Sequence, residues 1–162
     1  MKRFMLASGI LSLLGLLAFA CDSAKRDDSG VIVGAGDVEV ESVRVGDCFQ
    51  DWDGALNGEI VQLTTLSAVP CGEPHDNEIF HSFDLSDDGG FPGDASLESI
   101  AVDRCLRPFE AFVGIGYYDS RLDYGWMIPS LDSWREGDRE VVCFLFDLEF
   151  QPLVGSMRGV HI

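Results

Sequence analysis

The sequence predicts an α+β fold in which an antiparallel sheet packs against one main helix, with two disulfides as staples. Short Val-, Thr- and Phe-rich runs separated by Gly-, Asp- and Pro-containing turns predict the strands. Four cysteines beyond residue 40 are even in number and can pair. The helix is predicted within residues 94–113 by apolar side chains at spacings of four and three: Leu97, Ala101, Cys105, Phe109 and Phe112.

The predicted strands stand on both sides of the helix along the chain. Asp94 is expected to cap the helix and Gly114 to end it, while Pro108, which lacks an amide proton, is expected to kink or restart it. One main helix among antiparallel strands gives the α+β class. Strands are expected within residues 38–45, 60–69 and 77–85 before the helix, and within 124–128, 140–149 and 153–157 after it.

Residues 1–20 have the pattern of a secretory signal peptide. Two basic residues precede an uncharged, Leu-rich run over residues 5–17. That run is too short for a spanning helix, which needs about 20 apolar residues. We therefore expect an exported protein.

Cys21 directly follows this signal and is the odd one of five cysteines. The preceding Ala18-Phe19-Ala20 fits ordinary signal cleavage, but with Cys21 it also resembles a bacterial lipobox, although Ala18 stands where Leu is usual. An unpaired exported thiol is a liability, and lipidation accounts for it. We therefore expect Cys21 to carry a lipid anchor.

Three regions are expected along the chain. Residues 1–20 form the signal peptide, residues 21–37 the lipidated cysteine and a flexible polar tether, and residues 38–162 the folded domain.

The chain is strongly acidic for its 162 residues, with a net charge of −17. Removal of Lys2 and Arg3 with the signal reduces the basic side chains from 11 to 9 against 28 acidic ones, which gives −19. Such a surface cannot neutralise a run of phosphates, so we expect no nucleic-acid partner. Anionic lipid would also repel it, so the expected anchor has to provide the membrane attachment.

Four cysteines allow three disulfide pairings. We favour Cys105–Cys143, because it would join the inward face of the helix to the most apolar strand, and with it Cys48–Cys71. Paired thiols are expected outside the cytoplasm.

An ordered set of short motifs carries a family resemblance over about residues 43–159. The set resembles the septum-formation-related domain of exported and membrane-tethered bacterial proteins, notably of actinobacteria. The resemblance implies a tethered, disulfide-bonded module associated with the division septum, and it does not supply a catalytic reaction. The motifs are VGDCF at 45–49, VPCGEPHDNEIF at 69–80, FPG at 91–93, CL at 105–106 with Phe109, VG at 113–114, Tyr117, WREGDR at 134–139, VC at 142–143 and LVGSMRG at 153–159.

One segment carries candidate chemistry for a divalent metal. His75, Asp76, Glu78 and His81 lie close enough in the chain to supply ligands, but their number and spacing fall short of known zinc patterns. A polar turn fixed by Pro74 explains the same residues. We therefore expect no cofactor, and we keep a metal-dependent envelope enzyme centred on this segment as the alternative function.

Aromatic residues and one arginine form a candidate partner-binding set. Trp and Tyr beside Arg are common at binding surfaces, although the same rings can fill the core between helix and sheet. The set is Tyr117, Tyr124, Trp126, Trp134 and Arg135.

Taken together, these patterns predict a non-catalytic, lipid-anchored module on the outer face of the cytoplasmic membrane. We expect it to bind an envelope or division-associated protein, and we expect no small-molecule substrate, since no nucleophile, base and oxyanion site can be named together.

Overall fold

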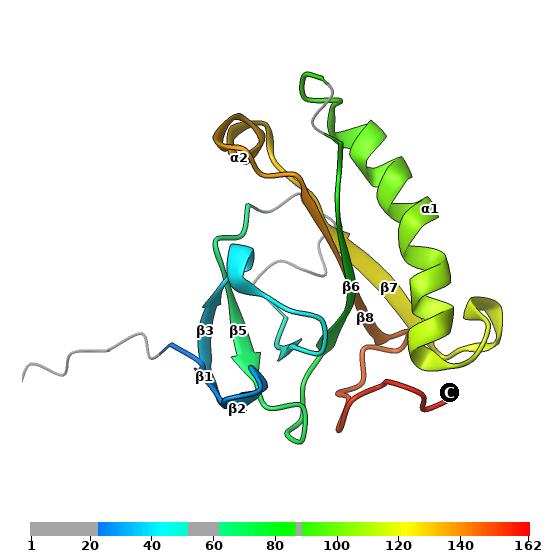
Figure 1. Cartoon of the computed structure of the whole chain (residues 1–162). Coiled ribbons are helices and arrows are strands. Elements are labelled where there is room, and N and C mark those ends of the chain that lie inside the picture. The colour runs from blue at the N-terminus through cyan, green and yellow to red at the C-terminus, as the bar shows by residue number, and fades with distance from the viewer. Residues whose placement is uncertain (1–22, 52–61, 87–88) are drawn as a thin grey trace, which may run out of the picture.

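The computed structural model describes residues 23–51, 62–86 and 89–162, and the strands of this part form two sheets (Figure 1). The smaller sheet pairs β1 with β2. The larger sheet has the order β3-β5-β4-β6-β8-β7, and every neighbouring pair is antiparallel. The strands are β1 (Lys25–Arg26), β2 (Ile32–Gly34), β3 (Gly36–Glu39), β4 (Cys48–Phe49), β5 (Thr65–Val69), β6 (Asn77–Asp84), β7 (Leu122–Met127) and β8 (Glu140–Asp147).

Two helices and two short 3-10 turns complete the described part. The helices are α1 (Asp94–Val113) and α2 (Leu131–Glu136), and the turns are η1 (Val40–Ser42) and η3 (Tyr117–Asp119). The predicted α+β class, with one main helix on an antiparallel sheet, is confirmed.

Helix α1 covers one face of the sheet, beside β6, β8 and β7 (Figure 1). Strand β8 alternates its side chains as a strand must, so Val141, Cys143 and Leu145 meet the helix while Val142 and Phe144 face the other way. Both sets are buried, which explains why β8 reads as an almost continuous apolar run. The helix contributes the buried residues Leu97, Ala101, Cys105, Phe109, Phe112 and Val113.

The ends of α1 agree only partly with the sequence prediction. Gly114 ends the helix as expected, in the left-handed conformation with φ 88°. At the other end Gly93 is the N-cap, and Asp94 is the first helical residue, where its charge suits the helix dipole. Pro108 lies inside a continuous helix and does not restart it.

The prediction of a flexible tether over residues 21–37 is wrong from Ser23 onward. The amide of Ala24 donates to the Asp37 carbonyl, β1 pairs with β2, and Ile32 is buried. Arg26 makes an ion pair of 2.7 Å with Asp47, which holds the hairpin to the body of the domain. Sequence composition missed this because the partner lies 21 residues further along the chain.

Two further elements differ from expectation. Helix α2 was not predicted; a capping box between Ser130 and Ser133 starts it, and Gly137 ends it. The strand predicted over 153–157 is absent from the structure at those residues, where a single bridge joins Leu153 to His75. Leu153 and Met157 are nonetheless buried in the α1 core, so their apolar character reflects packing without a strand.

Both favoured disulfides are present. Cys48–Cys71 ties β4 to the turn after β5, and Cys105–Cys143 ties α1 to β8. Each could stabilise the fold by about 2–4 kcal/mol, mainly by restricting the unfolded chain.

Within the described ranges, no helix is both long enough and apolar enough to cross a membrane. Helix α1 has the length but carries charged residues along its exposed side.

Candidate functional site

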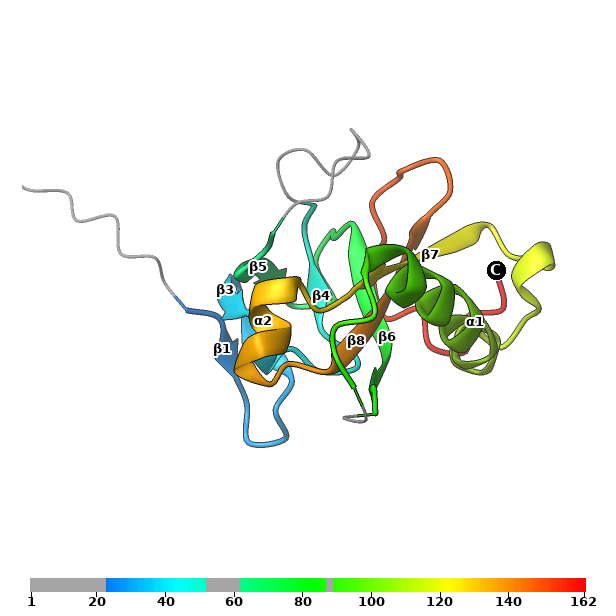
Figure 2. The same cartoon turned by 90° about the horizontal axis from the view of Figure 1, so that it is seen from above.

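A groove of about 810 Å³ lies beside α2, and its lining residues Met127 and Val142 belong to the core on the sheet face opposite α1. In Figure 2, which is seen from above, α2 lies in front of the strands. The groove lies between this helix, η1 and the strand ends of β6, β7 and β8. Its lining joins residues as far apart in the chain as Val40, Asp84 and Val142, which only the folded topology brings together. The apolar lining residues are Val40, Leu85, Met127, Ile128 and Val142.

Carboxylates dominate the polar lining of this groove. Five acidic residues line it, namely Glu41, Asp84, Glu136, Asp138 and Glu140. Asp138 is partly used by the fold, because it accepts hydrogen bonds from the Ser133 hydroxyl and the Glu140 amide.

Arg139 is the cation among the described lining residues. Its guanidinium stacks over the ring of Trp134 at 3.8 Å and donates to the carbonyl oxygens of Trp134 and Asp138. These contacts hold the guanidinium against α2. The groove therefore combines an excess of negative charge with an apolar lining.

The predicted aromatic set does not form one surface. The rings of Tyr117 and Tyr124 lie edge to face with their centroids 5.2 Å apart. Both rings, like that of Trp126, pack against the α1 core. The Tyr117 hydroxyl donates to Asp123, and this bond, together with burial, raises the pKa of Tyr117 to about 12. Burial raises the pKa of Tyr124 as well. These rings therefore fill space between the helix and the sheet.

The other two members of that set lie on α2. Trp134 is 7% exposed and meets the ring of Phe91. Arg135 points to solvent and pairs with Asp132 in an exposed ion pair. Trp134 thus contributes to the groove only indirectly, by supporting Arg139.

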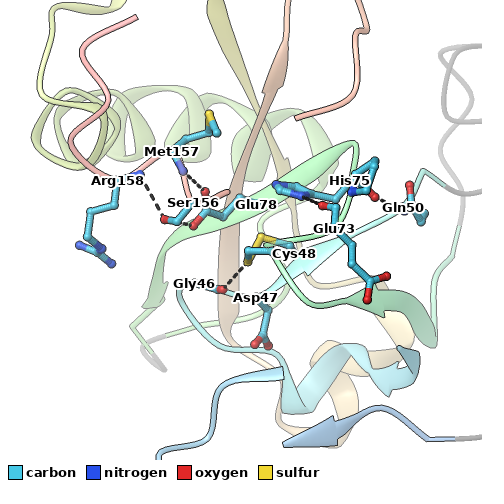
Figure 3. Close-up of a disulfide and its surroundings, with 12 residues drawn as sticks. Gly46, Asp47, Cys48, Gln50, Glu73, His75, Glu78, Ser156, Met157 and Arg158 are labelled. Carbon is cyan, nitrogen blue, oxygen red and sulfur yellow. Dashed lines mark hydrogen bonds between the residues drawn. A yellow bond between two sulfur atoms is a disulfide. The ribbon is translucent and has the colours of Figure 1, made fainter. Parts of the chain in front are cut away.

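The predicted metal segment divides in the structure. His75 and Glu78 are fully buried, and together with Cys48 they offer ligand atoms that all lie within 4.8 Å of one another (Figure 3). Asp76 instead accepts a hydrogen bond from the amide of Asp51. The ring centroid of His81 lies 5.8 Å from that of Phe83. Burial, and to a lesser extent the charge of Arg104, lowers the pKa of His81.

Hydrogen bonds fix both buried residues, His75 and Glu78. His75 Nδ1 donates to the Glu73 carbonyl at 2.8 Å, and the carboxylate of Glu78 accepts from Ser156 Oγ and the Met157 amide, both at 2.6 Å. Burial raises the pKa of Glu78. His75 Nε2 has no hydrogen-bond partner among the described residues, a state that costs about 1–3 kcal/mol for a buried polar atom.

Cys21, the predicted lipidation site, lies outside the described residues. Sequence reasoning also missed the groove, because most of its carboxylates read as ordinary surface charge. The only local signal was the acidic run around Glu136 and Asp138.

A family model described as Septum formation matches residues 33–143, about two thirds of the chain. The chain belongs to the septum-formation family. The match includes all four domain cysteines and the 75–81 segment, so the predicted resemblance is confirmed over those residues. Neither a curated protein nor a solved structure matches the chain significantly.

Membership in this family indicates a role in septum formation. The two disulfides are compatible with an extracytoplasmic location.

Proposed function

We propose that this member of the septum-formation family is a non-catalytic, lipid-anchored module outside the cytoplasm. It binds a basic, partly apolar segment of an envelope or division protein in the groove between α2, η1 and the sheet. The observation that supports this most directly is that five carboxylates line the groove together with five apolar side chains.

Charge complementarity selects the occupant. The carboxylates of Glu41, Asp84 and Glu136 are exposed, and the ion pairs of the described residues use other acids, namely Asp47, Asp132 and Asp147. A segment that alternates Lys or Arg with apolar side chains would neutralise the rim and cover Met127 and Val142. An acidic partner would be repelled.

The anchor and the location rest on the N-terminal sequence. The signal pattern of residues 1–20 and the unpaired Cys21 support export and lipidation, since the other four cysteines are all consumed in disulfides. Septal binding by a membrane-held module is consistent with the role that the family indicates.

Localisation in dividing cells tests the whole proposal. The full chain carries a C-terminal fluorophore that matures outside the cytoplasm, joined by a flexible linker because the Ile162 carbonyl accepts a bond from Ser120. We expect septal enrichment of the wild type and a soluble signal after Cys21→Ala. Uniform membrane signal of the wild type would remove the support for septal binding.

A matched pair of double variants tests the groove. Glu41→Lys with Glu136→Lys reverses the rim, whereas Asp103→Lys with Glu149→Lys makes the same change in net charge at exposed positions outside the groove. We expect the first pair to abolish septal enrichment and the second to leave it unchanged. Equal effects of the two pairs would show that overall charge, and not the groove, directs the protein.

The metal-dependent enzyme is the rival function. Of its four proposed residues only His75 and Glu78 share a cluster, whereas Asp76 and His81 make contacts elsewhere. Loss of function in dividing cells after His81→Ala, with septal localisation retained, would favour the enzyme over the binding module.

A further inference from the structure

His75 is arranged as metal-binding histidines are. Its Nδ1–H is fixed by the Glu73 carbonyl, which leaves the lone pair on Nε2. The residue is 0% exposed, and Nε2 has no hydrogen-bond partner within the described part of the chain. In metal sites one ring nitrogen is commonly held by a carbonyl in this way while the other binds the ion.

Glu78 brings an oxygen ligand to the same place. It is also fully buried, and no ion pair to it exists among the described residues. Ser156 Oγ and the Met157 amide each hold one carboxylate oxygen and leave further lone pairs free (Figure 3). A buried carboxylate favours a cation beside it.

Two sulfur atoms complete the surroundings. Cys48 stands directly opposite Glu78 in the pairing of β4 with β6, so the two side chains share a face of the sheet. Cys71 is joined to Cys48 with a Cα–Cα distance of 5.2 Å. Figure 3 shows the disulfide beside His75 and Glu78. In the disulfide both sulfurs are poor ligands, whereas their thiolates bind zinc strongly.

We propose that reduction of Cys48–Cys71 converts this cluster into a zinc site with Cys48, Cys71, His75 and Glu78 as ligands. Two sulfurs, one imidazole nitrogen and one carboxylate oxygen suit Zn²⁺, whereas Mg²⁺ and Ca²⁺ prefer oxygen alone. Tetrahedral zinc places its ligand atoms about 3.3–3.8 Å apart. The ligand atoms of Cys48, His75 and Glu78, which now lie within 4.8 Å of one another, therefore need to approach by about 1 Å. The sulfur of Cys71, now bonded to that of Cys48 at 1.96 Å, has to move away from it by about 2 Å to take the fourth position.

The chemistry requires a dithiol reductant, such as a reduced thiol–disulfide oxidoreductase outside the cytoplasm. The reductant gives two electrons and two protons to the protein disulfide and becomes a disulfide itself. Zn²⁺ then replaces both thiol protons and forms two Zn–S bonds. A disulfide oxidant reverses the sequence by taking two electrons from the thiolates, which restores the Cys48–Cys71 bond and releases Zn²⁺.

Exposure makes this disulfide the more reducible of the two. Cys71 is partly exposed, whereas Cys48, Cys105 and Cys143 are all 0% exposed. A thiolate can therefore approach the sulfur of Cys71 and leave the bridge beneath α1 intact.

Metal titration of the full chain, reduced by limited dithiothreitol and desalted without oxygen, tests the proposal. We expect the reduced chain to bind one Co²⁺ with thiolate charge-transfer absorption and with release of two protons, and then to exchange it for Zn²⁺ without further proton release. The oxidised chain is expected to bind neither metal. His75→Ala is expected to abolish tight binding. Ser156→Ala, which frees Glu78, is expected to weaken it about 10- to 100-fold.

His81→Ala is the matched control, because His81 lies outside the cluster and is expected to leave metal affinity unchanged. A reduced wild-type chain without stoichiometric Co²⁺ or Zn²⁺ overturns the proposal, whether or not it remains folded. Equal affinity after His75→Ala overturns the ligand set, and equal binding by the oxidised chain overturns the redox dependence. If His75→Ala does not fold, the comparison of metal binding by the reduced and the oxidised wild-type chain still tests the proposal.

Discussion

The ion pair between Arg26 and Asp47 should decide whether the N-terminal hairpin is folded. Arg26 donates to both carboxylate oxygens of Asp47, each at 2.7 Å, and Asp47 also accepts the Arg44 amide at 2.8 Å. The side chains are only 18% and 6% exposed. Arg26→Ala would leave a nearly buried carboxylate with one hydrogen bond in place of three.

Hydrogen bonds to charged groups contribute about 1.5–3 kcal/mol each, and rehydration of the partly exposed site returns some of this. We therefore expect Arg26→Ala to lower the free energy of unfolding of the hairpin by about 3 kcal/mol. A double-mutant cycle with Asp47→Ala should give a coupling of about 2 kcal/mol. The hairpin buries little apolar surface apart from Ile32, so it should open locally before the domain unfolds.

Hydrogen exchange at the amides of Ala24 and Asp27, which donate to Asp37 and Val31, measures this opening. The matched control is Arg135→Ala, because its pair with Asp132 is 67% and 79% exposed and should contribute no more than about 0.5 kcal/mol. Free exchange of the hairpin amides in the wild type would show that the ion pair between Arg26 and Asp47 does not hold the hairpin to the domain. The same conclusion would follow if Arg26→Ala lowered the free energy of unfolding no more than the control does.

Three further predictions concern the domain. Burial raises the pKa of Glu78 above its ordinary 4.5. Between pH 4.5 and the native pKa, the folded protein therefore keeps a proton that the unfolded chain has released. The free energy of unfolding should fall as the pH rises through this interval. Glu78→Gln should make the free energy of unfolding less dependent on pH, which urea unfolding across about pH 5–8 would measure. An unchanged pH dependence would mean that another group causes it. Gly125→Ala would place a Cβ 2.6 Å from the ring of Phe144 and should cost about 1–3 kcal/mol in thermal unfolding, and a neutral result would mean that the ring moves aside. Ser130→Ala removes the cap of α2 and should cost about 1 kcal/mol in the same measurement, whereas no loss would show that the capping box contributes nothing to stability.

Much of the fold could be predicted because its signals are local. The spacing from Leu97 to Phe112 specified α1, and the apolar run of β8 specified a central strand. The disulfide pairing followed from elements that have to pack together. Helix α2 escaped because six residues are too few to show helical periodicity, although Ser130 and Ser133 carried its capping signal.

The candidate sites depend on contacts between distant residues, which a single sequence does not reveal. Glu78 meets Ser156 across 78 positions, and Cys48 meets Glu78 through strand pairing. The sequence therefore indicated His75 and Glu78 correctly as neighbours, but it added Asp76 and His81, which lie elsewhere, and it missed Cys48. Likewise the apolar residues of 153–157 suggested a strand, whereas Leu153 and Met157 pack into the α1 core without one.

The early start of the fold has a mechanical consequence for an anchored protein. Ser23 already bridges to Asp37, and a chain extends at most about 3.6 Å per residue. Lipid on Cys21 would therefore hold Ser23 within about 7 Å of the bilayer surface, without a long linker that would let the domain move away from the membrane. A partner would have to present its segment close to the membrane, within the height of this one domain.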